Sequence, residues 1–287
     1  MRDMSWIPCV AATLLLCGCN LDERVPVEMV PLAKSQPIGS EKSLAADVHM
    51  DIGALEISGE GASNLYSLDL EYDKASYQPE ISYDPAAGEG RLTFRLESTR
   101  HGGIRSERHA NRARLSLTES IPVRLQINTG VGDARLALSH LRLTRLDLDA
   151  GVGGSRISAY EPNLVVCDEV RLRNGVGSLD AIGLGNLNFR RLDFEGGVGG
   201  ANLDFSGDWR QDAEIRIQVG VGGVTARMPR EVGVRVTAEK HFLSGFQLDG
   251  FRREGGEDYY SENYDKSKVH VSIVVKTGVG GFRLSWL

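Results

Sequence analysis

Two stretches of the chain, Arg145-Leu-Asp-Leu-Asp-Ala-Gly-Val-Gly-Gly154 and Arg191-Leu-Asp-Phe-Glu-Gly-Gly-Val-Gly-Gly200, are close copies of one another. The tripeptide Gly-Val-Gly within them occurs six times, beginning at Gly130, Gly151, Gly175, Gly197, Gly220 and Gly278. The first five copies are 21 to 24 residues apart, a spacing typical of solenoids, and the last gap of 58 residues leaves room for one divergent rung and one long loop. Because glycine permits positive φ and close backbone approach, we interpret these six glycines as structural turns.

Apolar residues alternate with polar ones on both sides of each turn. The positions three and five residues before the first glycine, and six residues after it, are apolar in every copy. A period of two is typical of one face of a β-strand directed into a core. Each rung is therefore predicted to hold at least two strands joined by a glycine arc. The predicted inward residues are Leu125, Ile127, Leu146, Leu148, Val170, Leu172, Leu192, Phe194, Ile215, Ile217, Ile273 and Val275 before the turn, and Leu136, Ile157, Ala181, Leu203, Ala226 and Leu284 after it.

The outward positions before the turn form three columns of mostly charged residues. Six residues before the first glycine the columns read Arg124, Arg145, Glu169, Arg191 and Glu214; four before, Gln126, Asp147, Arg171, Asp193 and Arg216; two before, Asn128, Asp149, Arg173, Glu195 and Gln218. From the second rung to the fifth the sign alternates in two columns and nearly so in the third. Such alternation predicts that consecutive rungs are parallel neighbours, because a slip by one rung would place like charges side by side.

These patterns predict an all-β fold. We expect a small N-terminal β domain over residues 47–120, followed by a single-chain parallel β-solenoid over residues 121–287 with about six to seven rungs of roughly 22 residues. The strand Phe282 to Leu287 ends the chain. If its edge is bare, it could pair with another copy; the sequence otherwise leaves the oligomeric state open.

The N-terminus resembles a bacterial lipoprotein signal. Arg2 precedes the apolar run Trp6 to Leu16, which is too short to span a bilayer, and the run ends in Leu16-Cys17-Gly18-Cys19. We expect residues 1–18 to be removed as a signal peptide and Cys19 to carry the lipid; an ordinary secretory signal is the alternative. Residues 19–46 are predicted to be a tether rich in charge and proline. Asn20 favours an outer-membrane address under the sorting rule known for enteric bacteria.

The remaining composition gives few indications of chemistry. Once Cys9 and Cys17 leave with the signal and Cys19 is lipidated, Cys167 is alone, and its apolar surroundings predict a small buried hydrophobe rather than a nucleophile. The net charge of −6 argues against a nucleic-acid binder. The repeat period differs from that of calcium-binding β-rolls, and the histidines lack metal-ligand spacing. No metal, cofactor or catalytic residue is predicted.

Paired carboxylates such as Asp147 and Asp149 raise the alternative of a carbohydrate-active β-helix. Both acids have an arginine neighbour in the predicted charge columns, and their spacing recurs with the repeat. A structural role is therefore favoured over a catalytic one.

Two segments lie outside the repeat and are candidates for binding. Residues 98–114, expected as an exposed loop, carry five arginines that could contact anionic envelope components, although a solvated loop is the simpler interpretation. Residues 241–264 carry aromatic rings that could bind sugar or peptide, although capping of the solenoid end is more usual. The arginines are Arg100, Arg105, Arg108, Arg112 and Arg114; the aromatic residues are Phe242, Phe246, Phe251, Tyr259, Tyr260 and Tyr264.

The chain resembles the toast-rack family of bacterial envelope proteins, whose function is unknown. The segments Met50-Asp-Ile-Gly-Ala-Leu-Glu-Ile-Ser-Gly59, Leu68-Asp-Leu-Glu-Tyr72 and Pro79-Glu-Ile-Ser-Tyr83 are similar to its N-terminal part. The repeats, and Pro229-Arg-Glu-Val-Gly-Val-Arg-Val236 in particular, resemble the extracellular region of LiaF-like proteins and glycine-rich candidate adhesins. LiaF-like members restrain a sensor kinase but carry membrane helices in place of a lipid anchor. The resemblance implies no catalytic residues.

Together these observations predict a non-enzymatic envelope protein that acts as a scaffold or adhesin-like interaction module. The lipid would attach it to the membrane, and its partner would be an envelope protein or an anionic envelope polymer. A LiaF-like regulator of envelope stress and a carbohydrate-active β-helix enzyme are the alternatives. An acidic cleft across the rungs would favour the enzyme, and flat ladder faces would favour the scaffold.

Overall fold

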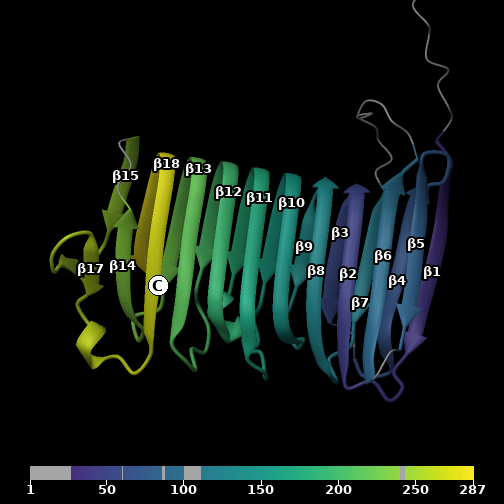
Figure 1. Cartoon of the computed structure of the whole chain (residues 1–287), viewed down its shortest axis with the longest axis horizontal. Coiled ribbons are helices and arrows are strands. Elements are labelled where there is room, and N and C mark those ends of the chain that lie inside the picture. The colour runs from purple at the N-terminus through teal and green to yellow at the C-terminus, as the bar shows by residue number, and fades with distance from the viewer. Residues whose placement is uncertain (1–26, 60, 86–87, 100–110, 240–242) are drawn as a thin grey trace, which may run out of the picture.

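The computed structural model describes residues 27–59, 61–85, 88–99, 111–239 and 243–287. In this part of the chain, strands stack side by side into a long flattened tube, which confirms the predicted all-β class and the mostly parallel stack (Figure 1). The elements are β1 (Met29–Pro37), β2 (Ser43–Ile52), β3 (Ala54–Gly59), β4 (Asn64–Asp73), β5 (Tyr77–Asp84), β6 (Glu89–Ser98), β7 (Arg112–Leu117), β8 (Pro122–Val131), β9 (Ala134–Ala137), β10 (Arg142–Ser158), β11 (Cys167–Ile182), η2 (Leu184–Leu187), β12 (Phe189–Asp204), β13 (Ala213–Met228), β14 (Gly233–Glu239), β15 (Leu243–Leu248), β16 (Phe251–Arg253), β17 (Asp258–Ser261), η3 (Tyr264–Lys266) and β18 (His270–Trp286).

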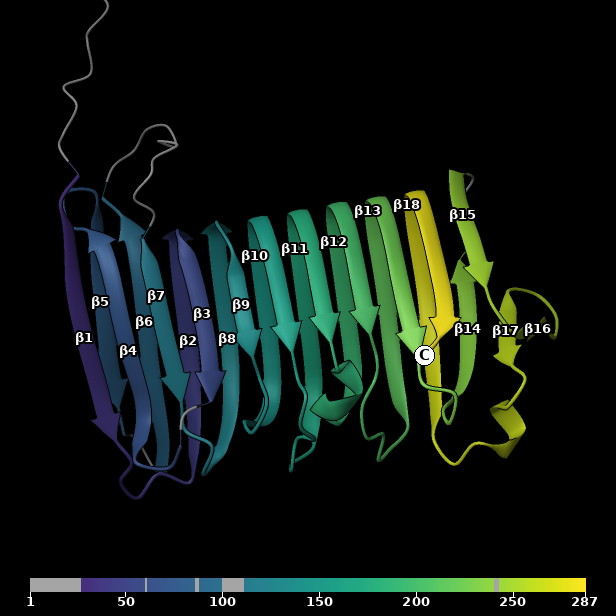
Figure 2. The ribbon, with the colours of Figure 1, turned by 180° about the vertical axis from the view of Figure 1, so that it is seen from behind.

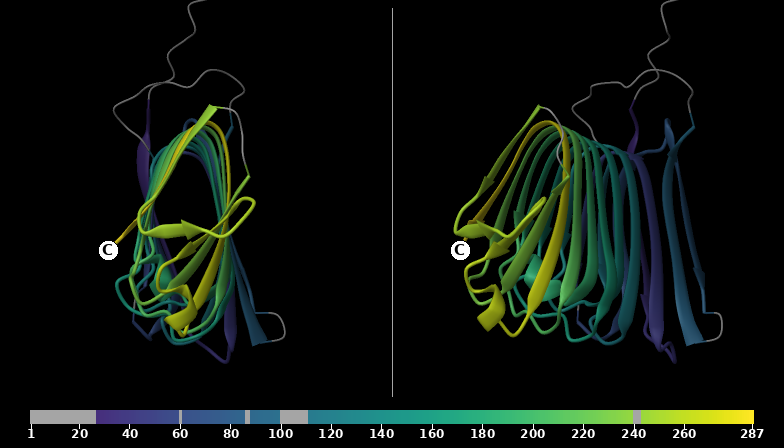
Figure 3. Two further views of the ribbon diagram at one scale, coloured as in Figure 1. Left: turned by 90° about the vertical axis from the view of Figure 1, so that its left-hand side faces the viewer. Right: turned by 60° about the vertical axis from the view of Figure 1, so that its left-hand side comes forward.

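Each central rung is one long bent strand. In β10 to β13 and in β18 the backbone stays extended through the Gly-Val-Gly motif and turns back on itself there. Viewed along the stack, the bends superimpose as a rounded corner, with the connections at the opposite edge (Figure 3). From behind, the second halves of the rungs run from the corner towards that opposite edge (Figure 2). The motif is therefore a bend within a strand and not a loop between strands.

The core fills the space between the two halves of every rung. All eighteen residues predicted to point inward are buried, with 3% or less of their surface exposed. Phe94, Phe189, Phe205 and Phe282 are among the largest fully buried side chains. The alternating pattern thus places one continuous apolar core along the tube.

Consecutive rungs are parallel neighbours in the predicted register. Asp147 lies opposite Arg171 in β10 and β11, and Arg171 lies opposite Asp193 in β12. The same register continues from β12 to β13, where Arg191 faces Glu214. The alternation of charge therefore indicated the correct partner for each of these strands.

The last rung departs from chain order. β18 pairs with β13 on one side and with β14 and β15 on the other, so the divergent rung lies beyond β18 instead of before it. Phe282, Arg283 and Leu284 consequently face partners on both sides, so this part of the final strand does not meet the condition of a bare edge. β18 takes this place because it carries the full motif, and its valine and glycines continue the corner of β13.

The N-terminal strands belong to the same stack. β2 and β3 lie beside β8 and β9, with Ile52 opposite Val131, and β6 and β7 form the next layer. The tether predicted over residues 19–46 is wrong for its described second half, because β1 and the start of β2 fall within it. β1 is held by a complete antiparallel ladder to β4, from Met29 opposite Asp73 to Pro37 opposite Asn64.

The two ends of the stack are closed differently. At the N-terminal end, the outer strands β1 and β5 contain Pro31, Pro37 and Pro79, residues that discourage further pairing of an edge. The Lys34 ammonium donates a hydrogen bond to the Ile81 carbonyl oxygen at 2.8 Å and so links these two strands. At the C-terminal end, β17 pairs antiparallel with β14 and covers its edge.

Two glycines of each motif are required for different reasons. The second glycine, which is the third residue of the motif, adopts positive φ, 143° at Gly199, and a β-carbon there would lie 1.8 Å from the Gly177 carbonyl oxygen of the preceding rung. The first glycine, which we predicted as the turn, keeps ordinary φ, but a β-carbon on Gly197 would lie 2.3 Å from the Gly175 carbonyl oxygen. Close approach of neighbouring rungs therefore excludes side chains at both positions.

Alanine substitutions at Gly199 and Gly200 should separate this constraint from a general preference for glycine. We expect Gly199→Ala to lower the free energy of unfolding by about 3 kcal/mol or more, because it combines backbone strain with overlap on a carbonyl group. Gly200→Ala is the matched control on the same rung, since its β-carbon would approach no atom closer than 3.8 Å. It should change stability by about 0.5 kcal/mol or less in urea unfolding. Equal losses in the two variants would contradict this explanation.

Candidate functional site

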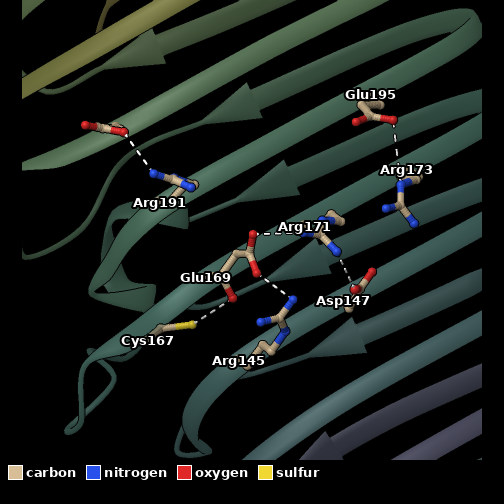
Figure 4. Close-up of polar contacts among 9 residues, drawn as sticks. Arg145, Asp147, Cys167, Glu169, Arg171, Arg173, Arg191 and Glu195 are labelled. Atoms are coloured by element: carbon tan, nitrogen blue, oxygen red, sulfur yellow. Dashed lines mark hydrogen bonds and ion pairs between the residues drawn. The ribbon is translucent and has the colours of Figure 1, made fainter.

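The charge columns form a ladder of ion pairs on the outer face before the corner (Figure 4). Five of these pairs join neighbouring rungs, and Arg173 contacts acids on both of its neighbouring strands. The pairs are Arg145–Glu169 at 2.5 Å, Arg171–Asp147 at 3.2 Å, Arg173–Asp149 at 3.2 Å, Arg173–Glu195 at 3.6 Å and Arg191–Glu214 at 3.4 Å. A further bond runs within β11, from Arg171 to Glu169 at 3.0 Å.

One position in this ladder brings like charges together. Arg124 of β8 lies directly opposite Arg145 of β10. Each guanidinium group turns to a different acid, Arg124 to Glu89 at 3.2 Å and Arg145 to Glu169. The ladder therefore contacts β6 of the N-terminal layer as well, and the repulsion between the two arginines is relieved by partners on opposite sides.

The paired carboxylates Asp147 and Asp149 are bound by arginines of the next rung. At the start of the same strands there is an open groove of about 1070 Å³, whose lining includes Asp168, Glu169 and Glu214. These acids also have arginine partners, with Arg190 at 2.8 Å from Asp168. The groove is thus a mixed-charge surface of the ladder and not the acidic cleft that the enzyme alternative requires.

A second ladder, which the sequence analysis missed, lies on the face after the corner. Glu56 of β3 is paired with Arg114 at 3.2 Å and Arg135 at 3.6 Å, and Asp180 of β11 lies 3.9 Å from Arg156. Asn202 donates to the other carboxylate oxygen of Asp180 at 2.7 Å. Aligning the fifth residue after each first glycine would have shown this column, although its signs alternate less regularly.

Cys167 confirms the prediction of a buried hydrophobe. Its side chain is fully buried at the start of β11, and burial raises the pKa of the thiol to about 12. The thiol donates a weak hydrogen bond to the Glu169 carbonyl oxygen at 3.5 Å. A thiol this deeply desolvated is not a nucleophile at neutral pH.

The basic segment is not the single loop that we expected over residues 98–114. Arg112 and Arg114 lie in β7, and Arg114 is bound to Glu56 of the adjacent strand. These two arginines therefore belong to a sheet face. Arg100, Arg105 and Arg108 lie outside the described residues.

The aromatic residues gather at the C-terminal end of the stack. Phe246 packs against Phe282 with ring centroids 5.7 Å apart, and Phe251 stacks on Trp286 at 5.5 Å with an interplanar angle of 11°. Phe246 also contacts Tyr259 at 5.5 Å, while Tyr264 meets the edge of Tyr260 at 5.0 Å. Of these rings, Phe246, Phe251 and Tyr259 pack against the core and cover its last rungs. Phe242 lies outside the described residues.

A row of exposed or half-buried aliphatic side chains runs along the corner edge. It consists of Ile52, Val131, Val152, Val176, Val198, Val221 and Val279, and we term it the corner ridge. Each member lies directly beside the next in the strand register. The five from Val152 onward are 48–51% exposed. The sequence signal for this ridge is the recurrence of one β-branched residue between two glycines, and a prediction based on the glycines alone does not include it.

The lipid-attachment candidate Cys19 lies outside the described residues. Within the described ranges, no three His, Cys, Asp or Glu side chains are grouped so that they could hold a metal ion. None of the helices in the described part is long and apolar enough to cross a bilayer.

Comparison with models of known protein families shows to which family the chain belongs. The model of the N-terminal domain of toast_rack (DUF2154) matches residues 24–182 and, a second time, residues 163–227. This chain belongs to the toast-rack family. The two matches overlap, as expected for a toast-rack protein whose successive rungs resemble one another. No curated protein matches the chain.

A search of solved structures also finds chains that are similar to this toast-rack protein. A candidate cell adhesion protein from Clostridium sporogenes is 22% identical, with a TM-score of 0.49 over 91% of this chain and 100% of the other. A candidate adhesin from Bacteroides fragilis is 14% identical, with a TM-score of 0.36 over 89% and 97%. A candidate lipid-binding protein from Parabacteroides distasonis is 8% identical, with a TM-score of 0.34 over 89% and 97%. Because these scores lie below 0.5, no function is transferred from them.

A charge exchange tests whether the ladder fixes the register. Asp147→Arg places an arginine directly opposite Arg171, on the face that also carries Arg124 and Arg145. We expect a loss of about 1 kcal/mol, equivalent to about 2–4 °C in melting temperature for a domain of this size.

Adding Arg171→Asp to this variant should recover part of the loss, because the exchange restores one opposite pair. Recovery is partial because Arg171 also binds Glu169. Differential scanning calorimetry of the two single variants and the double variant gives the coupling energy. A double variant whose loss equals the sum of the single losses would show that this pair does not act across the rungs.

Proposed function

We propose that this toast-rack protein is a lipid-anchored, non-enzymatic scaffold of the bacterial envelope that presents its two broad faces to partners. The observation that supports this most strongly is the pairing of ladder acids with arginines of adjacent rungs. Such faces are flat, charged and rigid, and they offer many weak polar contacts to a partner without a deep pocket.

The ladder also favours a scaffold over a glycosidase. A glycosidase needs one carboxyl group that donates a proton and a second that acts on the sugar or on water. Asp147 and Asp149 instead accept hydrogen bonds from the Arg171 and Arg173 guanidinium groups of the next rung. Their side chains serve the contact between rungs.

The anchor rests on the sequence Leu16-Cys17-Gly18-Cys19, with Asn20 favouring the outer membrane. Between Cys19 and β1 the chain has few residues, so the lipid would hold the stack close to the bilayer. The partner is an envelope protein or an anionic polymer. Identification of a sensor kinase among partners would favour the regulator alternative.

The anchor is tested by exchanging its two candidate cysteines. Cys19→Ser should lose labelling by a radioactive fatty acid and move from the detergent phase to the aqueous phase in phase partitioning. Cys17→Ser is the matched control. It keeps a small residue two positions before the attachment site and should retain both label and detergent partitioning. Retention of the label in the Cys19 variant would contradict the assignment.

The scaffold is tested by photo-crosslinking in cells from the two broad faces. We place the photoreactive residue at Glu195 on the face before the corner or at Arg156 on the face after it, because both side chains are more than half exposed. A specific adduct is expected from at least one face, in the membrane fraction and absent from a probe-free chain. Failure of both faces to give an adduct would contradict the scaffold.

A further inference from the structure

The corner ridge is an apolar surface with no covering element in the described part of the chain. Its seven members are stacked at the inter-strand spacing of about 4.8 Å, so the ridge is about 29 Å long. From Val131 onward each aliphatic residue stands between two glycines of its own strand. No neighbouring side chain along the strand shields it, and the valines form the outermost atoms of this edge.

Peptide groups beneath the ridge are hydrogen-bonded to the neighbouring rungs. The Gly53 N–H donates to the Val131 carbonyl oxygen at 2.9 Å, and the Gly132 N–H donates to the Val152 carbonyl oxygen at 2.9 Å. The parallel register continues through the corner in each following rung. An edge whose peptide groups are paired and whose side chains are aliphatic can enter an apolar environment without leaving unsatisfied polar groups.

The first described strand begins at this same edge. β1 begins at the edge where the rungs bend, so Met29 and the corner ridge lie on one side of the molecule (Figures 1 and 2). Only nine residues, 20–28, separate Cys19 from Met29. Even fully extended, they span at most about 35 Å. A lipid on Cys19 would therefore be joined to the stack at its corner edge.

We propose that the corner ridge docks on the phospholipid bilayer, with its valines in the interfacial region and the two broad faces upright. This rests on the lipid anchor proposed above. A lipid on one residue attaches the protein to the bilayer at one point but does not set its orientation. A straight apolar edge beside that point would hold the stack in one orientation on the surface. Both charged ladders then remain open to partners.

The opposite edge also exposes apolar groups, but in a different arrangement. Tyr160 and Leu164 are 70% and 67% exposed, and both lie in the single connection between β10 and β11. They form no row along the stack. Leu164 is consequently a control position that is more exposed than any ridge valine and lies on the edge that should face away from the membrane.

The experiment uses the lipidated full chain in phosphatidylcholine vesicles, with an environment-sensitive fluorophore on a single introduced cysteine. Val198→Cys probes the ridge and Leu164→Cys probes the opposite edge. Cys167 stays unlabelled in the folded protein because it is fully buried. We expect the fluorophore at position 198 to be shielded from aqueous iodide by at least about threefold relative to position 164, and to be quenched by spin-labelled lipid.

A further variant replaces the two valines on either side of the ridge probe with aspartate. Val176→Asp and Val221→Asp, the register neighbours of position 198, should return the iodide quenching of the ridge probe to the level at position 164. Flotation with vesicles and the melting temperature show that this variant is still anchored and folded.

The outcomes separate the two proposals. If the wild-type chain does not float with vesicles, the proposed lipid anchor is wrong. A chain that floats but shows equal iodide quenching at positions 198 and 164 overturns the ridge proposal alone. Concentration-dependent shielding of position 198 in the Cys19→Ser protein without vesicles would identify a second copy as the occupant and would also overturn it.

Discussion

The carbonyl oxygen of one corner glycine occupies the place where the corresponding glycine of the next rung would carry its β-carbon. The distances from that β-carbon to the oxygen are only 1.7–1.9 Å at Gly132, Gly153, Gly177, Gly199, Gly222 and Gly280. Any side chain would force neighbouring rungs apart. The strands therefore bend at the same residue in every rung, and this common bend sets the register of both halves.

The alignment of corners explains why surface features continue along the whole molecule. Because corresponding residues lie side by side, each column of the repeat becomes a row on the surface. Columns of alternating sign form ion-pair ladders, and the valine between the glycines forms an apolar ridge. Exposed ion pairs add little stability, so the core supplies most of it while the ladders select the partner strand. A toast-rack stack built in this way has rigid faces and one apolar edge.

Much of this arrangement could be predicted from the sequence because it repeats. The period-two columns identified the core, and the alternating charges identified the order of β10 to β13. For elements without a repeated signature, the sequence did not predict membership in the stack: residues 47–120 were assigned to a separate β domain. β2 and β3 join the stack with a corner that reads Asp51-Ile52-Gly53, and β1 was interpreted as a tether because Pro31 and Pro37 are poor strand residues in general.

The insertion of β18 between β13 and β14 also could not be predicted from the sequence pattern. The spacing of 58 residues showed that one rung diverges but not where it lies, since the choice depends on which rung can continue the glycine corner. Candidate binding residues were predicted less well than the fold. Two of the five arginines lie in a strand, and the other three lie outside the described residues. The valines of the motif were predicted only as part of a turn, and their exposure on the surface was not predicted.

The order of rungs at this end of the stack provides the most direct measurement of the corner register. Spin labels at Val221 and Val279 should lie on adjacent rungs, about 5 Å apart at the backbone, although 58 residues separate them in sequence. Their spectrum should show strong dipolar broadening, well beyond that of a Val152 and Val198 pair, which lies two rungs apart at about 10 Å. Equal broadening in the two pairs would place another rung between β13 and β18 and contradict the continuous corner.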